Sequence, residues 1–331
     1  MAILAAKVQD IPRLVREPDG LRALRNASGI LAAIAGNGPE AQSMMDKFEV
    51  LQLLPRVLSR VGNASLVPTS PGRRVADEAE AFITEALRAL SVICYNHVDN
   101  QRLACIAGIH HSLAPVFAFA NEPIAQAAAS LVRVLAQLSH FKHEACASKE
   151  LLRNMVLQLD FGAAMREELQ YEATTSGQSQ EHVAVRLVLR PASPAVAQAC
   201  AAALAALCNN HGDTQTALHK LGVIGVCKEA LVSEETTPSV KCAIMGLVVS
   251  LCSREPMVQK AVASSGVLEL MTRLLSAHEE DSLRRTAAWS LLKLATLKGS
   301  QEVILQGVQD LGLTQNPKDT MAVLQSLVSA A

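Results

Sequence analysis

Apolar residues recur along the chain at three- and four-residue spacings, and the stretch 266–296 shows this pattern most clearly. Residues at these spacings share one face of a helix, and the first such face holds Leu268, Met271, Leu274 and Leu275. The polar segment 277–281 interrupts the pattern. A second helix is predicted from about Ser282, which we expect to be its N-cap. Its apolar face holds Ala287, Ala288, Leu291, Leu294 and Ala295.

Weaker copies of this helix pair recur along the chain. We call the small residue that ends each Ala/Leu-rich helix the closing residue; the six are Ala35, Cys94, Ser139, Cys208, Cys252 and Ala295. Fourteen positions after each closing residue we expect a junction that starts the next helix, and Gly stands at this position three times. The junctions are Glu49, Gly108, Arg153, Gly222, Gly266 and Gln309, of which the one near Arg153 is irregular.

The spacing of the copies predicts an array of helical repeats. The period is about 44 residues, a length typical of repeats with two or three helices. We therefore predict an all-α fold, an α-solenoid of about six degenerate repeats over residues 1–331. Residues 1–20 and 313–331 are expected to cap the two ends, because a stack needs its end faces covered. The Pro-, Gly- and Ser-rich segment 61–77 and the segment 171–193 are interpreted as insertions.

One stretch departs from the helical pattern. Residues 182–190, within the second insertion, alternate apolar and polar side chains and could form a strand. We favour a short extended or helical segment packed along the insertion.

Composition excludes several functional classes. Hydrophobic residues make up 50% of the chain but aromatic residues only 3%, so the core must be built from aliphatic side chains. The net charge of −1 gives no indication of a nucleic-acid partner. No apolar run reaches the length of about 20 residues that a membrane span needs. The eight cysteines lack a CxxC pair, which favours reduced thiols in a cytoplasmic protein, with a nuclear or cytoskeletal location as alternatives.

The repeat unit resembles the armadillo repeat. The resemblance is carried by the junctions VASSGVLELMTRLL and LHKLGVIGVCKEAL and by the helix RTAAWSLLKLA, and it extends over about residues 21–312. It implies a right-handed superhelix of three-helix units, in which the third helices line a concave groove that binds proteins or extended peptides.

The groove positions differ from those of peptide-binding armadillo proteins. Nuclear-import adaptors and catenins carry an Asn ladder two residues before the closing residue, and this chain has no Asn there. A nuclear-transport adaptor is therefore disfavoured. The ladder positions, together with the positions four residues earlier, supply the candidate partner-binding residues. These are Arg88, Val92, Arg133, Gln137, Ser250, Trp289 and Lys293.

Two groups of residues have some potential for chemistry. His140, His143, Glu144 and Cys146 carry metal-ligand side chains, but they divide between two helix faces, so we expect no metal site. Cys94 and His97 are three apart, yet Cys94 holds the place of small packing residues in the other repeats. We expect no catalytic residue and no cofactor.

Two functions stay open. The first is a non-enzymatic scaffold or adaptor that binds a protein partner, possibly an acidic or extended segment, along the concave face. The second is a structural subunit of a large cytoskeletal, ciliary or organellar assembly.

Overall fold

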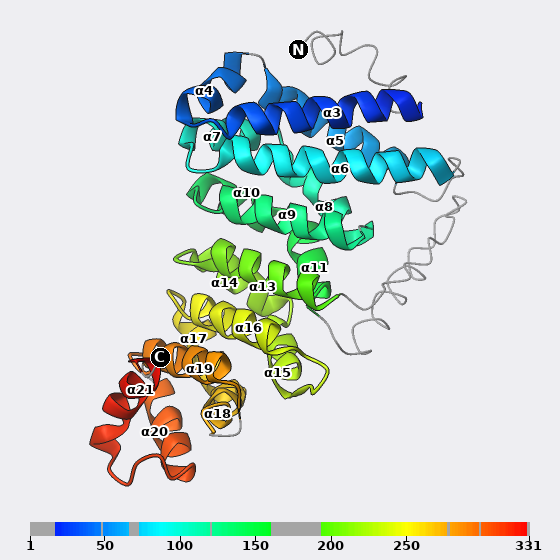
Figure 1. The fold of residues 1–331 in the computed structure, drawn as a ribbon. Coiled ribbons are helices and arrows are strands. Elements are labelled where there is room, and N and C mark those ends of the chain that lie inside the picture. The colour runs from blue at the N-terminus through cyan, green and yellow to red at the C-terminus, as the bar shows by residue number, and fades with distance from the viewer. Residues whose placement is uncertain are drawn as a thin grey trace, which may run out of the picture. The chain divides into compact units, whose positions relative to one another are not determined.

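The computed structural model describes residues 17–47, 49–65, 73–119, 121–159, 193–276, 279–297 and 299–329. Throughout these ranges the regular elements are helices (Figure 1). The chain divides into two compact units, with the boundary after Asn154, and each unit is described by itself.

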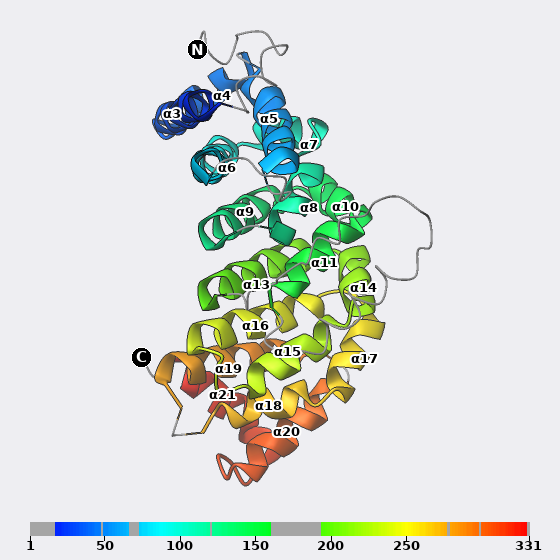
Figure 2. The same cartoon turned by 90° about the vertical axis from the view of Figure 1, so that its right-hand side faces the viewer.

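Unit 1 consists of layers that each contain up to three helices. Its helices are α3 (Pro18–Ala35), α4 (Pro39–Lys47), α5 (Val50–Ser65), α6 (Arg73–Cys94), α7 (Val98–Ile106), α8 (Ile109–Phe119), α9 (Glu122–Leu135), α10 (Ser139–Ala147) and the first part of α11 (Lys149–Leu157). The third helices α3, α6 and α9 pack side by side. Figure 2 shows them as one row, with α5 and α8 in a second row and α7 and α10 in a third.

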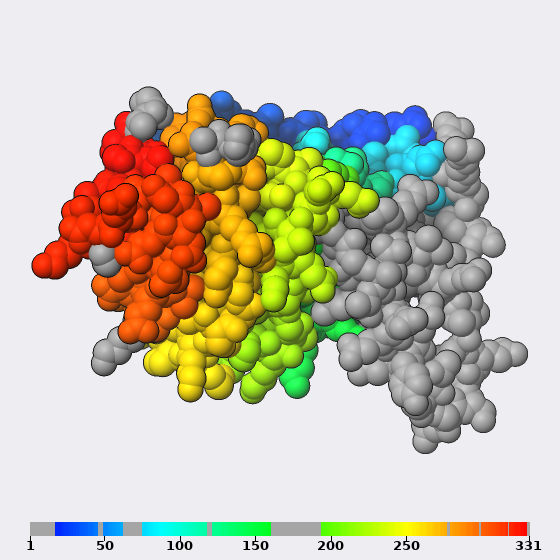
Figure 3. All heavy atoms as spheres, turned by 90° about the horizontal axis from the view of Figure 1, so that it is seen from below, coloured from blue at the N-terminus to red at the C-terminus, as the bar shows by residue number. Residues whose placement is uncertain are grey.

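Unit 2 repeats this arrangement. Its helices are α13 (Pro194–Cys208), α14 (Gly212–Lys220), α15 (Val223–Val232), α16 (Pro238–Leu251), α17 (Pro256–Ser264), α18 (Val267–Arg273), α19 (Asp281–Leu294), α20 (Ser300–Asp310), the 3-10 turn η1 (Pro317–Asp319) and α21 (Thr320–Ser329). Helices α13, α16, α19 and α21 pack in succession. In the space-filling view the layers of this unit form adjacent bands from yellow-green to red (Figure 3). The predicted fold class, an all-α solenoid of armadillo-like repeats, is confirmed.

The third helices have clear start signals. Pro194 opens α13, and the side chain of the N-cap Ser193 accepts a hydrogen bond from the Val196 amide. Asn121 caps α9 in the same way, and Pro123 follows it. Proline is well tolerated in the first turn of a helix, because a backbone N–H there would have no intrahelical acceptor. The buried faces are aliphatic, and the closing residues Cys94, Cys208 and Cys252 are fully buried or nearly so.

The junctions predicted from the sequence are left-handed turns in four of six repeats. Glu49, Gly108, Gly222 and Gly266 have φ values of 54°, 78°, 75° and 86°. Glycine is favoured there because it adopts positive φ without a steric cost, which explains its recurrence. The other two junctions were placed wrongly. Arg153 lies inside α11 and Gln309 inside α20; α10 ends before Ser148, and the chain turns with positive φ at Gly312.

Helix boundaries differ from the expectation in two further places. Ser282 is not the N-cap of α19, because the helix begins at Asp281 and the Ser282 hydroxyl contacts the Glu280 carboxylate. Helices α5 and α6 extend into both ends of the segment 61–77 that we interpreted as an insertion. Residues 1–16, 66–72 and 160–192 lie outside the described part, and with them most of the expected N-terminal cap, the second insertion and the stretch 182–190.

A glutamine seven residues after the closing residue joins consecutive layers. The Gln215 side-chain amide donates to the Cys208 carbonyl at 2.8 Å, within its own layer. It also donates to the Ser250 carbonyl at 3.1 Å, at the end of the next third helix. Gln42 and Gln101 lie at the same position in unit 1 and likewise bond to groups of the following layer. These amides satisfy carbonyls that helix C-termini leave without an intrahelical partner.

Replacing Gln215 by Leu should destabilise unit 2. The side chain is fully buried, and its carbonyl oxygen also accepts from the Glu255 amide at 2.9 Å. The substitution leaves several buried polar groups unpaired, so we expect a loss of about 2–4 kcal/mol in the free energy of unfolding. Urea unfolding followed by circular dichroism measures this loss. The control is Gln198→Leu, an exposed glutamine on α13; equal losses in the two variants would contradict the role of Gln215.

Candidate functional site

The exposed face of the third helices is the candidate site. In unit 1, Arg88 on α6 is exposed and Val92 is half-buried, while Arg133 on α9 is exposed. Gln137, which follows α9, is also exposed. In unit 2, Ser250 on α16 is half-buried, and Trp289 and Lys293 on α19 are exposed. All seven predicted residues are therefore accessible, and their part in binding stays a prediction.

In unit 1 this face is occupied by its own polar side chains. The Glu85 carboxylate reaches over Gly29 of α3, where an added Cβ would lie 3.3 Å from its oxygen. The same carboxylate is 3.9 Å from the Arg88 guanidinium. The Gln137 side-chain oxygen accepts a hydrogen bond from Gln101 at 3.0 Å. Any partner that binds here has to compete with these contacts.

In unit 2 the face is open and lined by small residues. Helix α13 presents Ala202 and Ala206, and α16 presents Gly246 and Ser250, all of them half-buried. A Cβ added at Gly246 would meet no atom within 4 Å. Small side chains let the backbone or side chains of a partner approach the helix surface closely. A partner can therefore contact the helix surface at Gly246 without first displacing a neighbouring side chain.

Trp289 borders this open face on α19. Its side chain is 44% exposed although it is a large aromatic residue. The Lys293 ammonium lies 5.8 Å from the centre of the indole ring, within the range of a cation–π interaction. Arg285, four residues before Trp289, is also exposed. Arg285, Trp289 and Lys293 thus form a stripe at four-residue spacing that combines positive charge with an aromatic surface.

The predicted packing role of Cys94 agrees with its surroundings. The thiol is fully buried, and burial raises its pKa well above the usual range, which disfavours the nucleophilic thiolate. His97 is used in structure: its Nδ1 atom accepts from the Asn100 amide as the N-cap of α7. Its Nε2 atom lies 2.9 Å from the Ser43 hydroxyl.

The histidine-rich segment 140–146 contacts His110, a partner that the sequence did not predict. Glu144 on α10 lies between two imidazoles, with its Oε1 atom 3.8 Å from His140 Nε2 and its Oε2 atom 3.5 Å from His110 Nε2. His110, on α8, is buried and its ring is 4.0 Å from that of His111. His143 is exposed and Cys146 half-buried. The Glu144 contacts therefore link α8 to α10, two helices that pack together in unit 1.

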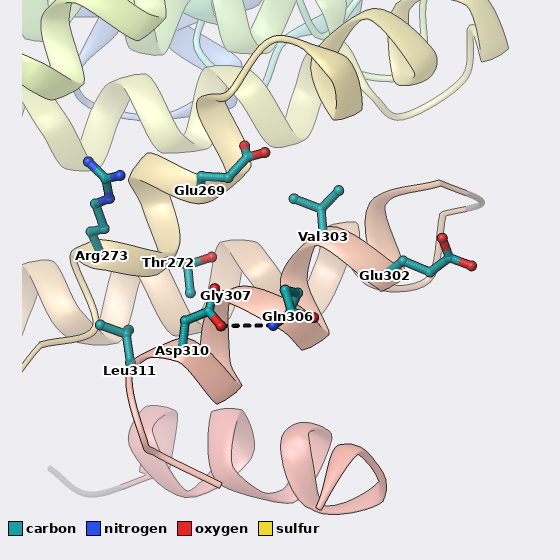
Figure 4. A pocket seen from close by; sticks show the side chains of 9 residues that line it. All are labelled: Glu269, Thr272, Arg273, Glu302, Val303, Gln306, Gly307, Asp310 and Leu311. Atoms are coloured by element: carbon teal, nitrogen blue, oxygen red, sulfur yellow. Dashed lines mark hydrogen bonds between the residues drawn. The ribbon is translucent and has the colours of Figure 1, made fainter. Parts of the chain in front are cut away.

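A surface hollow lies between α18 and α20, and it is separate from the exposed face of the third helices (Figure 4). Its volume is about 580 Å³, and its lining includes Glu269 and Arg273 from α18 and Glu302 and Asp310 from α20. Gly307 permits the close approach of the two helices, because a Cβ there would lie 2.8 Å from a methyl carbon of Thr272.

Sequence analysis missed the recurrent glutamine, although its signal was present. Counting seven positions from four of the closing residues gives Gln42, Gln101, Gln215 and Gln259. When the repeats are aligned on their closing residues, these glutamines share one position. Such an alignment could not have shown that two of the amides contact a backbone carbonyl of the following layer, since that contact depends on how the layers pack.

Stability should fall on acidification through His110. Burial lowers the His110 pKa below its ordinary value of 6.5, with further lowering by His111 and His140 that outweighs the opposite effect of Glu144. Because the folded pKa is lower than the unfolded one, the folded state disfavours the protonated form, and stability is lost as pH falls below about 6.5. We expect the melting temperature to drop by several degrees between pH 7.5 and 5.5, and to drop less in His110→Gln. An identical drop in both proteins would contradict this cause.

Neither a protein-family model nor a curated protein matches the chain. The part of the chain that the structure describes contains no helix long and apolar enough to cross a membrane.

Solved structures of repeat proteins are similar to this fold. An engineered protein shares 18% identity at a TM-score of 0.59 and covers 87% of this chain and 97% of its own. A structure of computationally designed armadillo repeat proteins for modular peptide recognition shares 16% identity at a TM-score of 0.57, covering 86% and 99% of the two chains. A designed armadillo repeat protein in complex with the peptide (KR)4 shares 15% at a TM-score of 0.55, covering 82% and 99%. The chain therefore has an armadillo-like helical repeat fold.

Proposed function

We propose that the chain is a non-enzymatic scaffold that binds an extended segment of a partner protein on the third helices of unit 2. The observation that carries this proposal is the open position at Gly246 of α16 together with the exposed Trp289 on α19, the helix that packs on α16. An exposed Trp is a frequent centre of binding energy at protein interfaces. The eight cysteines, all within the described ranges, form no disulfide with one another, which fits the cytoplasmic location that we include in the proposal.

The open face is suited to a segment with small or flat contacts. Ala202, Ala206, Gly246 and Ser250 expose few rotatable side chains, so little side-chain entropy is lost when a partner covers them. Trp289 at the border offers a large apolar surface. A partner segment would therefore lie across α13 and α16 and place an apolar side chain against the indole ring.

The charge of the α19 stripe favours an acidic segment. Arg285 and Lys293 flank Trp289 on the same side of the helix, and their charges attract carboxylates. One of the similar designed proteins is in complex with a Lys/Arg peptide; this chain presents cations on α19, and we propose the opposite preference. Arg88 and Arg133 extend the same expectation to unit 1, where the contact between Arg88 and Glu85 would have to open.

Filling the open position should block binding without harming the fold. Gly246→Phe places a large side chain on the open face, and the added Cβ meets no atom within 4 Å. We expect the affinity for an alternating Glu–Leu peptide of about eight residues to fall at least about tenfold, a loss of ~1.4 kcal/mol. Binding is measured by the emission of Trp289, the only Trp in the chain, which should shift to the blue as the peptide covers it.

The matched control is Gly225→Phe on α15, where an added Cβ also meets no atom within 4 Å. This variant should bind like the parent protein, and a Lys–Leu peptide should leave the emission unchanged. Equal binding by the two Phe variants would place the site elsewhere, and a preference for the Lys–Leu peptide would contradict the acidic partner.

Exposed apolar residues away from the third-helix face favour the second function, a structural subunit of a larger assembly. Tyr95, Val98 and Ile106 are 58%, 51% and 76% exposed in unit 1, and Val232 and Met257 are 59% and 54% exposed in unit 2. Apolar residues of this kind mark contacts with partners when they form a contiguous patch. Under this alternative, several surfaces of the chain would be buried at once.

The behaviour of the isolated chain separates the two functions. A scaffold should stay monomeric by light scattering at concentrations up to about 100 μM, because its exposed apolar residues are scattered rather than contiguous. A structural subunit should self-associate, and Ile106→Ser with Val232→Ser should then restore the monomer. Self-association that these substitutions reverse would favour the assembly subunit.

A further inference from the structure

Three side chains that can bind a metal ion meet between α8 and α10 in unit 1. His110 comes from α8, while His140 and Glu144 come from α10, where a spacing of four residues puts them on the same helix face. The Glu144 carboxylate lies 3.5 Å from His110 Nε2 and 3.8 Å from His140 Nε2. We call these three residues the histidine–carboxylate cluster.

The buried member of this cluster is poorly satisfied by the protein itself. His110 is 6% exposed, yet its Nδ1 atom has no hydrogen-bond partner within the described part of the chain. Its Nε2 atom lies 3.5 Å from Glu144, which is longer than a normal hydrogen bond. Buried polar groups are nearly always paired, and an ion is one way to complete a group that has no good partner. The Nε2 atom of His110 is therefore available to a metal ion.

The charge and exposure of the cluster favour a cation from the solvent. The Glu144 carboxylate contacts the two imidazoles, and within the described ranges no lysine or arginine forms an ion pair with it. Burial lowers the pKa of His110, so its imidazole is neutral at pH 7 and keeps a lone pair for a metal ion. The side chains of His140 and Glu144 are 57% and 37% exposed, so an ion can reach them.

Two imidazoles and one carboxylate are ligands that suit zinc, whereas magnesium and calcium prefer oxygen ligands alone. Around a tetrahedral zinc ion, ligand atoms at about 2.0–2.1 Å from the metal are about 3.3 Å from one another. The contacts of 3.5 Å and 3.8 Å are close to this value. The two histidines contact different oxygens of the carboxylate, so the exposed ring of His140 has to turn toward His110 to close the site.

We propose that His110, His140 and Glu144 bind one Zn²⁺ ion in unit 1, with water as the fourth ligand. The ion ties α8 to α10, and it binds independently of any partner on unit 2. Our expectation of no metal site concerned residues 140–146 alone, which divide between two helix faces. The third ligand comes from another helix, thirty residues earlier in the chain.

Calorimetric titration of the full chain with zinc, without a histidine tag, tests the site. We expect one zinc ion per chain. The affinity should fall at least about tenfold in His140→Gln and in Glu144→Gln, because losing a direct ligand weakens binding at least as much as losing a group that orients one. Neither residue is buried, so both variants should fold. The matched control is His143→Gln, an exposed histidine on the same helix, which should bind zinc like the parent protein.

Amide hydrogen exchange locates the bound ion. Zinc should slow exchange within α10 in the parent protein and leave it unchanged in His140→Gln, because the ion holds α10 against α8. The loss of stability on acidification expected above refers to the metal-free protein, so that measurement is made with EDTA present. The proposal is overturned if the parent protein shows no heat of zinc binding, or if His140→Gln binds as tightly as the parent. Loss of binding in His143→Gln would also overturn it, because the ion would then lie elsewhere.

Discussion

The amide of the recurrent glutamine is the interaction on which the layers of each unit depend. The C-terminal end of every third helix leaves backbone carbonyls without intrahelical partners, and these ends are buried between layers. Gln42 and Gln215 supply donors to such carbonyls of the next layer, while Gln101, Gln215 and Gln259 supply donors within their own. Aliphatic packing provides most of the buried area, but it is not directional. The hydrogen bonds of the amides are directional, so they fix the ends of these helices against the adjacent layer.

The sequence predicted the architecture because helical repeats follow from local patterns. The aliphatic spacing, the start signals at Ser193 and Pro194 and the glycine column at Gly108, Gly222 and Gly266 are all readable without tertiary information. Prediction failed where the local signal was weak. No glycine marks the turn near Ser148, and the glycine that follows α20 is Gly312, three residues beyond Gln309. A fixed count of fourteen residues therefore placed both junctions inside helices. The segment 61–77, which we interpreted as an insertion, contains the end of α5 and the start of α6.

The candidate site was predictable only in part. The register of the third helices predicted Trp289 and Lys293 on the groove side, and both residues are exposed. Their part in binding stays a prediction. The difference between the units depends on contacts across layers. Glu85 covers Gly29 in unit 1, whereas nothing lies within 4 Å of the Cβ position at Gly246. Both glycines look alike in the sequence, and only the neighbouring layer decides which one is open. The contact of His110 with Glu144 likewise depends on how α8 packs against α10, which the sequence does not show.

The contacts of the glutamines couple neighbouring layers in both chain directions. Gln42 bonds to the Val92 and Tyr95 carbonyls, and Gln215 bonds to the Ser250 carbonyl, so the earlier layer supplies donors to the later one. Donors also point backward, since Asn100 bonds to the Gln42 carbonyl and Arg254 bonds to the Asn210 carbonyl. Losing either layer of a pair therefore removes hydrogen-bond partners from the other, and the layers of a unit should unfold together rather than one at a time from one end.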